Sequence, residues 1–128
     1  MKLHHIGYVV DNFESYFDFF PKLQVNKKII DPVQNAEIIL CNNGDSSTYV
    51  ELIKPIDEKS FTWNFLQKGG GLHHICYDSL KLIEIEEVIK KYKMLKIRGP
   101  MYAKLFDKEV IFVITKTKDI VEFIVCEK

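Results

Sequence analysis

Two segments of this chain recur further along it, in the same order and at nearly the same spacing. The run LHHIGYVV, which contains His5, returns as LHHICYD, which contains His74, 69 positions later. The run TYVELI, which contains Glu51, returns as DIVEFI, which contains Glu122, 71 positions later. A repeat at a fixed period indicates that one structural unit occurs twice.

The repeat divides the chain into two modules. The first module covers about residues 1–58 and the second about 72–128, joined by a connector of about 59–71. With 128 residues the chain has the length of one compact domain, so we expect both modules to form a single domain over residues 1–128. Phe61, Trp63, Phe65 and Leu66 predict a short helix in the connector, which ends at the glycine run 69–71.

Apolar periodicity and turn residues predict the same order of elements in both modules: strand, helix and three strands. Asp11 or Asn12 is expected to cap the first helix, which Pro21 would end, and Gly99-Pro100 is expected to separate two strands of the second module. The predicted strands of the first module cover 3–10, 25–31, 36–41 and 48–53. In the second module they cover 72–77, 95–98, 109–114 and 119–125, and the helix covers about 80–93.

The repeated histidines lie on strands whose side chains alternate between the two faces of a sheet. His5 therefore shares its face with Gly7, and His74 shares its face with Cys76. A small neighbour beside each imidazole is typical of an open cleft. The opposite face carries larger side chains that suit packing under the helices; these are Ile6, Tyr8, Val10, Ile75 and Tyr77.

The repeated glutamates lie within strongly apolar runs. A buried carboxylate is costly unless it has a cationic partner, and no Lys or Arg occupies a matching position in both modules. One metal ion shared by Glu51, Glu122, His5 and His74 would satisfy both carboxylates. Two imidazoles and two carboxylates suit Ni²⁺, Co²⁺, Zn²⁺ or Mn²⁺, and open coordination positions would make the site catalytic.

Other interpretations remain open at this point. Duplication also preserves a structural pair of residues without any metal. His4 and His73 point to the opposite face and suit packing roles. The three cysteines, Cys41, Cys76 and Cys126, are expected to be small core residues, because none stands in CxxC spacing or beside a repeated base.

Composition excludes several classes of function. Lys and Arg together number 18, as do Asp and Glu, so the chain lacks the basic excess of a nucleic-acid-binding protein. Apolar residues make up 47% of the chain, but no window approaches the ~18 uninterrupted apolar residues of a membrane span. An odd cysteine count and the absence of a signal-peptide pattern lead us to expect a cytoplasmic protein.

The runs HHIGYVV, YVELIKP, GGGLHHICYD and VEFIV resemble, in order and spacing, the vicinal oxygen chelate superfamily, which includes glyoxalase I, extradiol dioxygenases and bleomycin-resistance proteins. The resemblance covers essentially the whole chain, and GGGLHHIC is most similar to the methylmalonyl-CoA epimerase branch. It implies an α+β fold of two paired βαβββ modules that form a cupped, barrel-like mixed sheet around a metal site. It also places the family's metal ligands on His5, Glu51, His74 and Glu122.

The function that the resemblance implies is a divalent-metal-dependent epimerase that removes a proton next to a carbonyl or thioester. Its partners would be a small carbonyl or acyl-CoA substrate and a second copy of the chain in a homodimer. Glu37 and Glu122 would act as opposed carboxylate bases across the substrate. The alternatives are a glyoxalase I-like lyase and a non-catalytic ligand-binding or resistance protein. Glu51, where many epimerases carry Gln, and the charged loop at 107–109 depart from the epimerase pattern.

Overall fold

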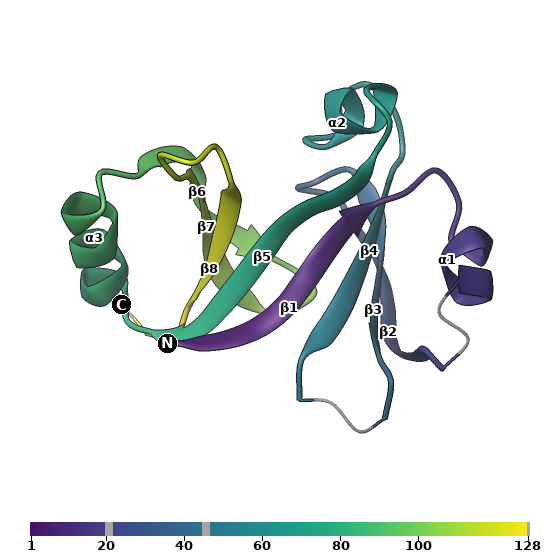
Figure 1. Cartoon of the computed structure of the whole chain (residues 1–128), viewed down its shortest axis with the longest axis horizontal. Helices are drawn as coiled ribbons and strands as arrows, with labels where there is room; N and C mark the ends of the chain where they lie inside the picture. The colour runs from purple at the N-terminus through teal and green to yellow at the C-terminus, as the bar shows by residue number, and fades with distance from the viewer. Residues whose placement is uncertain (20–21, 45–46, 128) are drawn as a thin grey trace. The chain divides into compact units, whose positions relative to one another are not determined.

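The computed structural model describes residues 1–19, 22–44 and 47–127 (Figure 1). The chain divides into two compact units. The first-module unit is His5–His73, and the second-module unit is His74–Lys128 together with Met1–His4. The first strand, β1 (Lys2–Val9), therefore has residues in both units. The assignment of both modules to a single domain stays a prediction.

In its described residues, the first-module unit holds the four strands of the first module and two short helices. The strands are hydrogen-bonded in the order β2-β3-β4-β1, with β1 parallel to β4 and the other pairs antiparallel. After β1 the elements are α1 (Glu14–Phe19), β2 (Gln24–Asp31), β3 (Ala36–Asn42), β4 (Tyr49–Pro55) and α2 (Trp63–Gln67).

The second module repeats this arrangement. Its strands follow the order β5-β8-β7-β6, with β5 parallel to β8, so each strand has the same neighbours as its counterpart in the first module. The elements are β5 (Gly71–Leu80), α3 (Leu82–Lys91), β6 (Leu95–Ala103), β7 (Lys108–Ile114) and β8 (Ile120–Val125). The predicted βαβββ repeat is confirmed, and the eight strands belong to one mixed sheet.

Each module packs its helix against one face of its strands. In the first-module unit, Phe13, which directly precedes α1, joins a buried cluster with Val10, which directly follows β1. Tyr8 of β1 packs against the same cluster. In the second-module unit, Ile85 of α3 joins a cluster that includes Tyr77 of β5. The remaining members come from alternate positions of the neighbouring strands; they include Ile39, Cys41, Leu52, Ile111, Val113, Val121 and Phe123. The repeated histidines and glutamates lie on the other face, because they occupy the intervening strand positions.

Local signals account for the start of α1 and for the turn after α2. The Asn12 side-chain oxygen accepts a hydrogen bond from the Ser15 backbone N–H at 2.9 Å, which confirms Asn12 as the residue that caps α1. The predicted stop at Pro21 lies outside the described residues. The glycine run after α2 includes Gly70, whose φ is +67° and where an added Cβ would lie 2.7 Å from the Val9 carbonyl oxygen. Only glycine fits that approach.

One predicted boundary was wrong. Gly99-Pro100 does not separate two strands, because β6 continues through both residues to Ala103. The strand accommodates them by shifting its register against β7 between Lys96 and Arg98, and again between Arg98 and Met101. Such β-bulges change which face the following side chains occupy.

Candidate metal centre

The first-module unit holds a buried pair of a histidine and a glutamate. Nε2 of His5 lies 3.3 Å from Oε1 of Glu51, and the two side chains are 0% and 4% exposed. The register explains the pair: Glu51 lies opposite Gly7 across the parallel strands β1 and β4, and His5 precedes Gly7 by two positions on the same face. Because Gly7 has no side chain, the imidazole of His5 can approach the Glu51 carboxylate.

The second-module unit holds the equivalent pair. Nε2 of His74 lies 3.1 Å from Oε1 of Glu122, with side chains 0% and 2% exposed. Cys76 lies opposite Glu122 across the parallel strands β5 and β8, as Gly7 lies opposite Glu51. The ring of Phe112 on β7 meets the His74 imidazole edge-on, with 5.4 Å between ring centroids. The structure therefore brings together the predicted residues of each module.

The chemistry of these pairs fits a divalent cation. Each pair offers an imidazole nitrogen and a carboxylate oxygen, which are the ligand types that Ni²⁺, Co²⁺, Zn²⁺ and Mn²⁺ accept. The four carboxylate and imidazole groups of His5, Glu51, His74 and Glu122 are nearly excluded from solvent. An ionised carboxylate in such surroundings requires positive charge or hydrogen-bond donors beside it. An imidazole beside each glutamate supplies part of that requirement, and a metal ion would supply the rest.

Glu37 does not lie where a base for this site is needed. It is on β3, as predicted, and half-buried. However, Glu37 pairs with Lys54, whereas Leu40 pairs with Glu51, so the two glutamates occupy opposite faces of the first-module strands. The face of Glu37 is the one that α1 covers. Because Glu37 is three positions from Leu40 on β3, its side chain projects from the opposite face. The catalytic role of Glu37 stays a prediction, and the proposal below does not use it.

The family model described as the Glyoxalase/Bleomycin resistance/Dioxygenase superfamily matches residues 4–100. The chain belongs to this superfamily. The resemblance and the fold class that it implied are both confirmed.

Relatives and structural neighbours within the superfamily include methylmalonyl-CoA epimerases. The mitochondrial methylmalonyl-CoA epimerase of Homo sapiens is 28% identical over 116 residues, covering 87% of this chain and 65% of that protein. A hypothetical protein from Bacillus halodurans is 27% identical with a TM-score of 0.82, covering 99% and 94% of the two chains. The Streptomyces coelicolor epimerase in complex with 2-nitronate-propionyl-CoA is 17% identical with a TM-score of 0.80, covering 98% and 96%.

The chain is shorter than the superfamily's curated relatives that it matches. It spans 54% to 65% of their length. Within residues 1–19, 22–44 and 47–127, no helix is long and apolar enough to cross a membrane.

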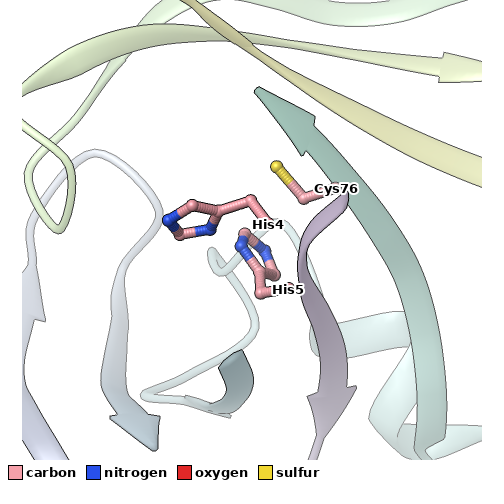
Figure 2. A group of neighbouring side chains, drawn as sticks. All are labelled: His4, His5 and Cys76. Carbon is pink, nitrogen blue, oxygen red and sulfur yellow. The ribbon is translucent and has the colours of Figure 1, made fainter. Parts of the chain in front are cut away.

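The other histidines of this superfamily member have packing contacts. His73 is buried, and its ring meets Phe65 edge-on at 4.8 Å. The His4 ring meets Phe106 in the same geometry at 5.1 Å. Figure 2 shows His4 beside His5 on β1, with Cys76 on β5; a His4 ring nitrogen and the Cys76 sulfur lie within 4.8 Å of each other. The edge-on contact with Phe106 agrees with the packing role predicted for His4.

The cysteines differ in their surroundings, although none of the three forms a disulfide bond within the described residues. Cys41 and Cys76 are buried, as predicted, but Cys126 is exposed just after β8, so its predicted core role was wrong. Burial raises the pKa of the Cys41 thiol from 9.0 to about 11. The Cys41 thiol is therefore protonated at neutral pH.

Proposed function

We propose that this chain is an isomerase of the epimerase type, which removes and returns a proton at the carbon next to the thioester of an acyl-CoA. The observation that carries the proposal is the recurrence of one buried imidazole–carboxylate pair at equivalent positions of both modules. The epimerase relatives support the choice of reaction. An S. coelicolor neighbour with 2-nitronate-propionyl-CoA supports an acyl-CoA as the substrate class.

We propose that His5, Glu51, His74 and Glu122 together hold one divalent metal ion, of the group Ni²⁺, Co²⁺, Zn²⁺ and Mn²⁺. When bound, the ion supplies positive charge that stabilises the enolate oxygen formed as the proton leaves. The two imidazoles would bind as neutral ligands through Nε2, the atom that already faces the carboxylate in each pair.

In this proposal Glu122 accepts the proton. Its carboxylate is buried, so bulk water does not compete with the substrate for its oxygens. His74, with Nε2 3.1 Å from Oε1, and the Phe112 ring packed against that imidazole hold the two groups in a fixed orientation. A base fixed in position needs less reorganisation when the proton transfers.

Inversion at carbon requires the proton to return from the opposite side. Since Glu37 lies on the helix-covered face, the second carboxylate in the proposal is Glu51, the counterpart of Glu122 in the first module. A Glu51→Gln variant separates the two steps, because it keeps a side chain of the same shape. We expect it to retain α-proton exchange and to lose most of the inversion.

The test is α-proton exchange of methylmalonyl-CoA in D₂O, followed by NMR for metal-loaded and chelator-treated protein. Metal-dependent exchange with inversion supports the epimerase. If protein with bound metal gives no exchange, the acyl-CoA proposal fails, and a thiol-derived hemithioacetal, the substrate class of the glyoxalase I alternative, is the next compound to test. Homodimer formation is a separate expectation, checked by the mass of the native protein in solution.

A further inference from the structure

The single arginine of the sequence, Arg98, lies on the same face of the second module as Glu122. Arg98 on β6 is directly opposite Phe112 on β7, and Phe112 is directly opposite Glu122 on β8. Residues directly opposite each other on neighbouring strands project from the same face of a sheet. The row Arg98, Phe112, Glu122 therefore runs across three adjacent strands, and Cys76 on β5 continues it.

Two contacts support this assignment of faces independently of the register. The Phe112 ring meets the His74 imidazole, so the middle of the row lies on the histidine face. Lys96, two residues before Arg98, pairs with Glu86 of α3 at 3.0 Å, so it lies on the helix face. Residues two apart normally share a face, but the β-bulge between Lys96 and Arg98 places them on opposite faces.

The spacing suits a substrate that extends from Glu122 past the Phe112 ring and carries its anionic group to Arg98. Neighbouring strands lie about 4.8 Å apart, so the Cα atoms of Arg98 and Glu122 are separated by roughly 10 Å across two strand spacings. Arg98 is half-buried. A guanidinium binds carboxylate and phosphate oxygens through two parallel hydrogen bonds, and Arg serves this purpose better than Lys.

We propose that Arg98 binds an anionic group of the substrate, either the free carboxylate of a dicarboxylic acyl thioester or a phosphate of its CoA. This inference rests on the proposed function and names a residue that recognises the substrate. Arg98 positions the reacting carbon relative to Glu122 and takes no part in the proton transfer. Arg98 also makes the protein bind a substrate with an anionic group more tightly than an uncharged acyl thioester.

The first experiment uses the wild-type protein. Because the sequence has one arginine, a ¹H–¹⁵N spectrum contains one arginine Nε–Hε signal, which belongs to Arg98. Methylmalonyl-CoA is titrated in, together with two comparison compounds: propionyl-CoA, which lacks the carboxylate, and methylmalonyl-pantetheine, which lacks the phosphates. We expect a saturable shift of the signal with methylmalonyl-CoA. A shift that persists with methylmalonyl-pantetheine identifies the carboxylate, and one that persists with propionyl-CoA identifies the phosphate.

The second experiment compares variants. Arg98→Gln is expected to raise KM for methylmalonyl-CoA by about 10- to 100-fold, the range for losing a charge-assisted hydrogen bond. Arg98→Lys should recover part of the loss, and metal content and thermal stability should match wild type. Lys96→Gln is the matched control, a cation removed from the same strand but from the other face, and its KM should stay within twofold.

An unmoved Nε–Hε signal at saturating methylmalonyl-CoA would overturn the proposal, as would an Arg98→Gln variant with wild-type KM. The NMR result can be read whether or not the wild type turns over, because the titration detects binding alone. If the wild type binds the compound and shifts the signal without α-proton exchange, the anion site stands and the epimerase proposal fails.

Discussion

Nε2 of His74 lies 3.1 Å from Oε1 of Glu122, and the same two atoms of His5 and Glu51 lie 3.3 Å apart. In each module a parallel strand pair produces the contact, with a residue of small volume, Cys76 or Gly7, opposite the glutamate. A buried carboxylate next to an imidazole thus arises twice from one local sequence pattern. This relationship underlies the metal site that we propose.

Removing one carboxylate charge from the second pair should weaken metal binding. Glu122→Ala leaves the imidazole of His74 without its neighbouring anion, so we expect the Kd for Co²⁺ or Zn²⁺ to rise by more than about 100-fold, beyond the effect typical of residues outside the ligand set. Isothermal titration of chelator-treated protein measures the change. Glu127→Gln removes a carboxylate from an exposed ion pair with Lys81 and should leave the Kd unchanged. Equal affinities in the two variants would contradict the ligand role.

The repeat was sufficient to predict the βαβββ order of both modules and the residues of both pairs, and the family resemblance supplied the fold class. Offsets in sequence locate His5, His74, Glu51 and Glu122 at equivalent strand positions, and alternation then puts each pair on one face. Two features of the strands could not be predicted from the sequence. The face of Glu37 follows from the register of β3 with β4, and the face of Arg98 follows from a β-bulge in β6. Strand periodicity in the sequence gives no information about either the register or the bulge. The sequence marks Arg98 only as its single arginine, and this does not indicate which face of the sheet the side chain occupies.

Glu37 should be dispensable for turnover. Since its side chain lies on the face covered by α1, Glu37→Ala is expected to keep metal content and kcat within about twofold of wild type. The measurement is the exchange assay in D₂O beside a metal determination. A large loss of kcat with metal retained would show that Glu37 reaches the substrate, contrary to the strand register.

Gly70→Ala should destabilise the protein. The new Cβ would meet the Val9 carbonyl oxygen at 2.7 Å, in a residue whose φ is +67°. We expect the free energy of unfolding to fall by about 1–3 kcal/mol, measured by urea denaturation. Gly71→Ala is the matched control, because its φ is +95° but nothing lies within 4 Å of the added atom. An effect at Gly71 as large as that at Gly70 would show that the contact with Val9 is unimportant.

The Cys41 thiol should make stability depend on alkaline pH. Burial raises its pKa to about 11 in the folded protein from 9.0, so the folded state holds this proton more tightly than the unfolded state. The resulting stabilisation is complete below pH 9 and is lost as pH rises to about 11. Cys41→Val should therefore show a shallower decline in the denaturation midpoint over this range. Cys126→Ser, at an exposed thiol, should decline as wild type does.

The stoichiometry of metal binding tests the central proposal most directly. Chelator-treated wild-type protein would be titrated with Co²⁺, and the bound metal counted per chain by calorimetry and elemental analysis. One ion per chain, lost on substitution of either His5 or His74, is the predicted result, because both His–Glu pairs then contribute to a single site. Two ions per chain, each lost with one histidine only, or no bound ion at all, would contradict it.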